Sequence, residues 1–162
     1  MEIKKIGADD VDALAPLDAD FRVALRSYKG VVVQPDVQAG REELLYYLEK
    51  GYPIFAALEQ GQFLGYAVCR IDDSCVWVEA LYVRPEYRRR HVASALFDCA
   101  QALARSYEQD TVYNYVHPNN DGVIAFLRSR GYDVLNLIEI RKPYAGEAPD
   151  AVYRVGNNDF RY

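Results

Sequence analysis

The sequence predicts a mixed α/β protein in which a central twisted sheet of six to seven strands, partly antiparallel, is flanked by about four helices. Three β-forming stretches, 53–59, 62–71 and 76–83, follow one another across short turns, which is typical of an antiparallel meander. The stretch 88–104 has helical spacing and leads to another β-forming stretch, 111–117. Because a helix connects them, the strands 76–83 and 111–117 are expected to be parallel.

Length and composition indicate one globular domain. The chain has 162 residues, of which 51% are hydrophobic and 27% are charged, so it is large enough to bury a core. No repeat or low-complexity linker interrupts it. We therefore predict a single domain over 1–162, in which 143–162 form a C-terminal loop, an edge strand and a tail.

Net charge, the length of apolar runs and cysteine spacing argue against nucleic-acid, membrane and metal binding. Lys and Arg number 19 against 24 Asp and Glu, and this net charge of −5 argues against a nucleic-acid partner. No apolar run has the length of a membrane span, and the N-terminus lacks the apolar segment of a signal peptide, so we expect a cytoplasmic protein without a membrane partner. The cysteines, Cys69, Cys75 and Cys99, lack metal-ligand spacing, so we predict buried thiols and no metal site.

The N-terminal part should form a short strand and two helices. The strand is predicted at 2–6. The first helix has apolar residues every three or four positions, at Val11, Leu14, Leu17 and Phe21. Pro16 lies inside it and predicts a kink or a break. After an irregular stretch, 27–40, a second helix is predicted over 41–50, with Gly51 as its C-terminal stop.

The meander follows. A tight hairpin across Gln60-Gly61 joins its first two strands. The stretch 76–83 is a nearly continuous run of β-formers, which predicts a strand covered on both faces, and Glu79 is its only charge. Pro85 ends this strand because proline cannot donate a hydrogen bond to a sheet.

A basic turn lies between the last strand of the meander and the helix that follows it. Arg88, Arg89, Arg90 and His91 lead into apolar positions at helical spacing, namely Val92, Ala93, Leu96, Phe97, Ala100, Leu103 and Ala104. The first turn of a helix has free N–H groups and a partial positive charge, and arginines beside it complete an anion site. The alternative is a solvated basic cluster that keeps the turn soluble.

The C-terminal part is predicted to contain one helix and two further strands. Val123, Ile124, Phe126 and Leu127 have the spacing of a short helix that ends near Gly131-Tyr132. The apolar run 133–142 is predicted as a sixth strand. The stretch 151–155 is expected to be an edge strand, and 156–162 a tail.

The stretch from Val83 to Leu96 resembles the acetyl-CoA-binding motif of the GNAT superfamily of N-acetyltransferases, which reads Arg/Gln-x-x-Gly-x-Gly/Ala after a central strand. Arg88 falls on the first position and Ala93 on the last. His91 stands where the middle glycine is usual. A side chain is tolerated there if the backbone is right-handed helix, and it is strained if φ is positive.

A second stretch supports this resemblance. Asn120 to Gly131-Tyr132 is similar to a later GNAT motif, in which an Asn opens a helix that closes on Gly-Phe. The order of the predicted helices and strands also resembles the GNAT fold along most of the chain.

The resemblance implies that acetyl-CoA is the co-substrate. Backbone groups of Leu81, Tyr82 and Val83 would pair with the pantetheine arm at the end of the central strand. The pyrophosphate would lie over the turn formed by Arg88, Arg89, Arg90, His91, Val92, Ala93 and Ser94. Asn120, with Asn119 as the alternative, would contact the pantetheine from the other side.

The resemblance also implies direct acetyl transfer, which needs a proton acceptor. Glu79 is one candidate, because a lone carboxylate in an apolar strand needs a partner or water. Its alternative role is structural, paired with a nearby Arg or Tyr. His117 at the end of the fifth strand is the second candidate, because the ordinary pKa of histidine suits base chemistry. The alternative there is an exposed loop histidine.

The usual acid of the family is a Tyr on the last helix, and Leu127 stands at that position here. Tyr115 or another of the 14 tyrosines could replace it, or the thiolate could leave unaided. We therefore predict an N-acetyltransferase that acts on a primary amine of a small molecule or a protein. The alternative is a non-catalytic acyl-CoA-binding regulatory module.

The acceptor and the oligomeric state are less constrained. In this superfamily the acceptor pocket is built by segments that correspond here to 21–40 and 142–150, with Tyr28 and Tyr144 as candidate wall residues. The aromatic C-terminal tail, 159–162, makes a homodimer through the last strands a further expectation.

Overall fold

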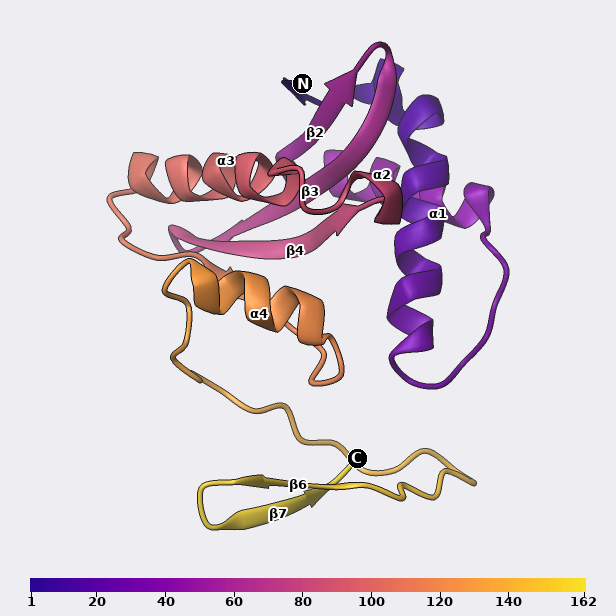
Figure 1. Ribbon diagram of the computed structural model, residues 1–162, viewed down its shortest axis with the longest axis vertical. Helices are drawn as coiled ribbons and strands as arrows, with labels where there is room; N and C mark the ends of the chain where they lie inside the picture. Colours follow the sequence, from indigo (N-terminus) through magenta and orange to yellow (C-terminus); the bar gives the residue numbers. More distant parts are fainter. The chain divides into compact units, whose positions relative to one another are not determined.

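The computed structural model describes all residues from Met1 to Tyr162 (Figure 1). The chain divides into two compact units, Met1–Phe126 and Leu127–Tyr162. The first unit contains a five-stranded sheet and three of the four helices, and the second contains a two-stranded sheet. The mixed α/β class is confirmed, while the single-domain organisation stays a prediction.

The central sheet has the order β1-β2-β3-β4-β5. Its strands are β1 (Glu2–Lys5), β2 (Ile54–Glu59), β3 (Gln62–Asp72), β4 (Cys75–Val83) and β5 (Tyr113–Asn114). The first four are antiparallel neighbours, and β5 is parallel to β4. The structure therefore confirms the antiparallel meander and the helical crossover to a parallel strand.

Helices cover both faces of this sheet (Figure 1). The helices α1 (Val11–Ser27) and α2 (Val37–Glu49) pack on one face, and α3 (Val92–Ser106) packs on the other. The first core includes Val11, Leu14, Leu17, Leu44, Ile54, Tyr66 and Val68, and the second includes Ala57, Leu64, Ala67, Val83, Val92 and Leu96. Short 3-10 turns, Ala8–Asp10 and Pro85–Tyr87, precede α1 and follow β4.

The N-terminal helices differ from the prediction in their extent. The helix α1 continues through Pro16 without a break, since its apolar residues are buried on the sheet and this packing outweighs one missing hydrogen bond, while a kink at Pro16 stays a prediction. The helix α2 begins at Val37, where the sequence predicted irregular chain, because the Asp36 side chain caps it by accepting a 2.9 Å hydrogen bond from Ala39 N–H. Gly51 ends α2 with a φ of +73°, as predicted.

A β-bulge in the middle of β4 places Glu79 opposite no residue of β3. Val68 pairs with Ala80 and Cys69 pairs with Val78, so the register shifts by one residue at this point. The parallel pairing of β4 with β5 covers only Trp77 and Val78 and stops at the bulge. The predicted strand 111–117 is therefore reduced to two residues, because a bulge bends its strand away from its neighbour.

The C-terminal unit differs most from the prediction. Its strands β6 (Val152–Val155) and β7 (Asn158–Arg161) form an antiparallel hairpin, so the predicted edge strand is confirmed and part of the predicted tail is its partner. The prediction of a strand over 133–142 was wrong, because these residues belong to no sheet. A strand exists only where a neighbour accepts and donates its backbone hydrogen bonds. The helix α4 (Asp121–Ser129) precedes this stretch.

Candidate functional site

The site begins at the free edge of β4 beyond the bulge. Since β5 pairs only with Trp77 and Val78, the backbone from Ala80 to Val83 has β3 on one side and no strand on the other. The predicted pantetheine-binding residues, Leu81 to Val83, all lie in this part of β4. The Val83 carbonyl already accepts a 3.1 Å hydrogen bond from Arg88 Nε.

The turn between β4 and α3 has the backbone geometry of an anion site. Its φ angles are positive at Arg89 (58°) and His91 (61°) but not at Arg90 between them, and such alternation points successive N–H groups to one side. His91 is the N-cap of α3. The first hydrogen bond of the helix joins Ala95 N–H to the His91 carbonyl, so the amides of the first turn lack helical acceptors.

His91 therefore has a backbone conformation in which glycine has the smallest steric strain. Its φ of 61° and ψ of 12° lie in the left-handed region, the case in which the sequence predicted strain. His91 is exposed, so its ring has room to point away from a bound phosphate.

Two of the three arginines have partners within the chain. The Arg88 guanidinium binds the Val83 carbonyl and lies 6.0 Å from the centre of the Tyr82 ring. Arg90 Nη2 donates a 2.9 Å hydrogen bond to Glu59 Oε2, and this hydrogen bond lowers the pKa of Glu59. The cluster is thus anchored to β2 and β4, although all three side chains remain exposed.

Glu79 is held by an arginine of the neighbouring strand. Arg70 Nε lies 2.5 Å from Glu79 Oε1, and Arg70 Nη1 lies 2.9 Å from Asp72 Oδ2. The same guanidinium lies 5.2 Å from the centre of the Trp77 ring. The Glu79 side chain is 24% exposed, so it retains access to water or to a ligand. The sequence foresaw a nearby Arg as an alternative but did not identify Arg70, because the bulge decides which β3 residue lies beside Glu79.

His117 lies against the C-terminal end of α1. Its ring stacks on Tyr28 with centroids 5.6 Å apart. His117 Nδ1 accepts a 3.2 Å hydrogen bond from Asn119 N–H, and Asn119 Nδ2 donates to the Tyr28 carbonyl at 3.0 Å. Burial, followed by the charge of Lys29, lowers the pKa of His117. In the neutral ring an accepting Nδ1 leaves the proton on Nε2, so Nε2 can donate a hydrogen bond. The role of His117 as a base stays a prediction.

Asn120 is the N-cap of α4. Its Oδ1 accepts a 3.2 Å hydrogen bond from Val123 N–H, and its carbonyl accepts one of 3.0 Å from Ile124 N–H. This capping role uses the side-chain oxygen of Asn120 and does not use its side-chain NH2 group. Leu127 on the same helix is buried, and Tyr115 is 63% exposed and stacks on Trp77 with centroids 4.8 Å apart.

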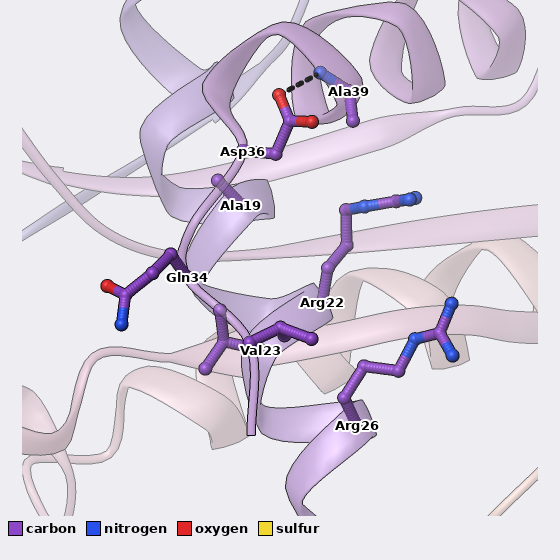
Figure 2. Close-up of a pocket in the computed structure, with 8 residues that line it drawn as sticks. Ala19, Arg22, Val23, Arg26, Gln34, Asp36 and Ala39 are labelled. Atoms are coloured by element: carbon purple, nitrogen blue, oxygen red, sulfur yellow. Dashed lines mark hydrogen bonds between the residues drawn. The ribbon is translucent and has the colours of Figure 1, made fainter. Parts of the chain in front are cut away.

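A pocket of about 230 Å³ lies between α1 and the chain that leads into α2 (Figure 2). It is lined by Ala19, Arg22, Val23, Arg26, Val33, Gln34, Asp36 and Ala39. Figure 2 shows the side chains of Arg22 and Arg26 extending to the same side, while Asp36 is engaged with Ala39. Except for Ala19, the lining falls in the segment 21–40, where the sequence predicted acceptor contacts. The Arg22 guanidinium is paired with Glu43, so Arg26 is the arginine that favours an anionic or carbonyl group here.

The sequence matches the acetyltransferase (GNAT) family over residues 21–132. The chain belongs to this family. The GNAT resemblance predicted from the Arg88–Ala93 and Asn120–Tyr132 motifs is thus confirmed, and membership makes the chain an acyltransferase.

Solved structures of other acetyltransferases have the same fold. A ribosomal-protein-alanine N-acetyltransferase from Brucella melitensis biovar Abortus 2308 is 15% identical, with a TM-score of 0.69 over 89% of this chain and 100% of that chain. The AAC(6')-Iy protein in complex with a CoA-containing bisubstrate analog is 19% identical, with a TM-score of 0.66 over 88% and 98%. PaiA N-acetyltransferase from Thermoplasma acidophilum in complex with coenzyme A is 18% identical, with a TM-score of 0.67 over 80% and 87%. A search of curated proteins found no match.

None of the helices combines the length and the apolar character needed to cross a bilayer.

Proposed function

We propose that this GNAT protein uses acetyl-CoA to acetylate a primary amine of a small molecule or a protein by direct transfer. The observation that carries the proposal is the free edge of β4, which opens at the Glu79 bulge and leads into the amide-rich turn before α3. Acceptors of both kinds fit the fold, since the structural neighbours include enzymes named for an aminoglycoside and for a ribosomal protein.

The pantetheine arm would pair with Leu81 to Val83 as an additional strand pairs with a sheet edge. Arg88 would then leave the Val83 carbonyl and turn toward the pyrophosphate. The amides of Val92, Ala93 and Ser94 at the start of α3 would bind the phosphate oxygens, since the helix dipole favours negative charge there. Asn120 would use its side-chain N–H groups on the pantetheine from the α4 side.

In the transfer step the amine nitrogen attacks the thioester carbonyl, a C–N bond forms, the C–S bond breaks and the amine loses a proton. Glu79 would accept this proton directly or through one water, because the bulge places it where β4 and β5 part. Arg70 would orient the carboxylate. His117 would position the loop that carries Asn120, since its Nδ1 already binds Asn119 N–H.

Leu127 cannot protonate the leaving group. A thiol has an ordinary pKa of about 8.5, so a thiolate is a tolerable leaving group near neutral pH without an acid. Tyr115 would be the protein's remaining candidate, because it is exposed and stacks on Trp77, two residues before Glu79.

The test is a calorimetric titration of acetyl-CoA into the protein, followed by a thiol-release assay with a panel of amines. We expect micromolar binding that the combined changes Arg88→Ala, Arg89→Ala and Arg90→Ala weaken by about 10- to 100-fold. Arg105→Ala, in the last turn of α3, is the matched control and should leave affinity unchanged.

Two results would contradict the proposal in different ways. Absence of acetyl-CoA binding by the parent protein would remove the cofactor site. Tight binding without thiol release for any amine would favour a non-catalytic acyl-CoA-binding module.

A further inference from the structure

The tip of the β2–β3 hairpin carries two polar side chains beside each other. Glu59 and Gln62 are opposite residues that close the hairpin across the two-residue turn Gln60-Gly61. Directly opposite residues of an antiparallel pair project to the same face of the sheet. Val83, the last residue of β4, pairs with Gly65, so the hairpin continues beyond the end of β4.

Two side chains of the turn after β4 reach this hairpin tip. Arg90 Nη2 donates its 2.9 Å hydrogen bond to Glu59 Oε2, and the Tyr87 hydroxyl donates one of 3.1 Å to Gln62 Oε1. The Arg90 guanidinium also lies 5.4 Å from the centre of the Tyr87 ring, and Tyr87 packs on the core between the sheet and α3. The turn is therefore held to the hairpin at two positions, by side chains that also interact with each other.

The backbone of this turn needs such support. Arg89 and His91 both have positive φ, which residues with a Cβ adopt only at a cost in free energy. A backbone of this kind persists when its surroundings hold it in place. The same conformation directs the amides that would bind the pyrophosphate, so a turn released from the hairpin would lose the alignment of these donors.

The charge of Glu59 is balanced by two cations. Its Oε2 binds Arg90, and its Oε1 lies 3.6 Å from the N-terminal nitrogen of Met1. The side chains of Glu59 and Arg90 are 35% and 48% exposed, so water and salt screen the pair. The carboxylate therefore has little net effect on a phosphate at longer range, and its main effect on the turn is through Arg90.

We propose that Glu59 is a positioning residue of the cofactor site, which holds the anion-binding turn in its binding conformation through Arg90. This inference rests on the proposed function, because it concerns the acetyl-CoA site of that proposal. It assigns the Arg90 side chain to the support of the turn, while the backbone amides contact the phosphates.

Calorimetric titration of acetyl-CoA into the protein and its variants tests the role of Glu59. We expect Glu59→Gln to weaken binding by about 3-fold, which is within what an exposed ion pair contributes. The direction is decisive, because removal of a carboxylate that only repelled the phosphates would strengthen binding. The matched control is Asp12→Asn, which removes another exposed ion pair, Arg41 Nε to Asp12 Oδ1 at 2.7 Å, and should leave the affinity unchanged.

A charge exchange tests whether Arg90 acts through Glu59 or contacts the phosphates itself. Arg90→Glu alone should weaken binding by about 10-fold, since two carboxylates then face each other. Addition of Glu59→Arg should restore the affinity to within about 2-fold of the parent, because the ion pair is rebuilt in reverse. The control combines Arg90→Glu with Glu86→Arg, which gives the same net charge from a position in the Pro85–Tyr87 turn and should not restore the affinity.

Trypsin digestion reports on the turn in the absence of acetyl-CoA. Cleavage after Arg88, Arg89 and Arg90, followed by mass spectrometry, should be about 3-fold faster in Glu59→Gln than in the parent, because the released turn opens more often. Asp12→Asn should be cleaved there at the rate of the parent.

The outcomes separate this inference from the proposed function. If the parent protein binds no acetyl-CoA, the proposed function is wrong and this inference fails with it. If the parent binds and Glu59→Gln binds equally or more tightly, only this inference is overturned. A charge exchange that does not restore the affinity, or a Glu86→Arg control that restores it equally, would also overturn it, since Arg90 would then act on the phosphates directly or through net charge.

Discussion

The stretches Val76–Val83 and Val134–Ile140 have similar composition but different structures. Each is a run of apolar β-formers with a single acidic residue, Glu79 in one and Glu139 in the other. The first is β4, which pairs with β3 on both sides of the bulge at Glu79 and buries alternate side chains, and the second is exposed and unpaired. The difference shows that strand propensity needs a neighbouring edge, which only the fold supplies.

The largest expected effect tests this comparison with the same substitution in both stretches. Val76 is fully buried and Val134 is 86% exposed. Val76→Asp should lower the free energy of unfolding by more than about 4 kcal/mol, because it buries an unpaired charge. Val134→Asp should change it by less than about 0.5 kcal/mol in dilute protein. Urea unfolding measures both changes in free energy, and equal effects would mean that the two stretches are buried alike.

The two acidic residues allow a second comparison, on activity. Glu79→Gln should lower kcat by about 100-fold or more while acetyl-CoA affinity stays unchanged, since a positioned proton acceptor contributes a factor of this size. Glu139→Gln, the same change in the exposed stretch, should leave kcat unchanged. Steady-state kinetics and calorimetry report the two quantities.

The variant Asp72→Asn tests whether Glu79 accepts a proton or only holds Arg70 in place. Asp72 shares this arginine with Glu79 but lies at the exposed end of β3. If the Asp72 and Glu79 variants lose equal activity, the role of Glu79 is to hold Arg70 rather than to accept a proton.

One carboxylate of the molecule, that of Asp18, is buried, and its titration makes the stability depend on pH. Asp18 on α1 is 1% exposed, its Oδ1 accepts a 2.5 Å hydrogen bond from the Tyr66 hydroxyl, and its Oδ2 has no hydrogen-bond partner. Burial raises the pKa of Asp18, and the Tyr66 hydrogen bond opposes this only in part. The folded state therefore holds the Asp18 proton to higher pH than the unfolded chain does, and the stability that this proton provides is lost as pH rises through the folded pKa.

Asp18→Asn should remove this loss. Between pH 4 and neutral pH, roughly the window above the ordinary pKa of an aspartate, the variant should gain stability relative to the parent as pH rises. Chemical denaturation of both proteins across this range gives the difference, in which other carboxylates such as Asp10 cancel. A difference that is constant with pH would show that Asp18 ionises equally in both states.

The smallest expected effect concerns the turns that follow the two stretches. The turn after Val134–Ile140 has Gly146 at a φ of +79°, whereas the turn after β4 has His91 at +61°. His91→Gly should raise stability by up to about 1 kcal/mol, because glycine adopts this conformation without the steric cost of Cβ. Ser94→Gly, in the first turn of α3, should lower it by about 0.5–1 kcal/mol. Thermal unfolding distinguishes the two, and a loss of stability in both would mean that the His91 side chain makes a stabilising contact.

Much of the fold followed from local patterns. Apolar periodicity located α3 and the meander, and Gly51 was recognised as the end of α2. The motif around Arg88 and Ala93 identified the family. The start of α2 at Val37 was missed because Asp36 acts as its cap. A kink or a break of α1 was expected at Pro16, and the break does not occur because propensity ignores packing on the sheet.

The candidate site was predicted in composition but not in geometry. Glu79 and His117 were both named, yet the partners that determine their chemistry, Arg70 and Asn119, were not. Arg70 meets Glu79 diagonally across β3 and β4, so the contact depends on the cross-strand register, and the sequence of β4 carries no signal for that register or for its bulge. His117 meets Tyr28 through residues 89 positions apart in sequence, a contact that local patterns cannot predict.

By itself, the sequence determined the class of the fold, the order of most of its elements, the family and the residues of the anion-binding turn, because these depend on periodicity and on short motifs within one element. Tertiary structure decided where β4 and β5 separate, which atoms pair with Glu79 and His117, and which apolar stretch becomes a strand. These features depend on register and on neighbouring edges, which join residues distant in sequence.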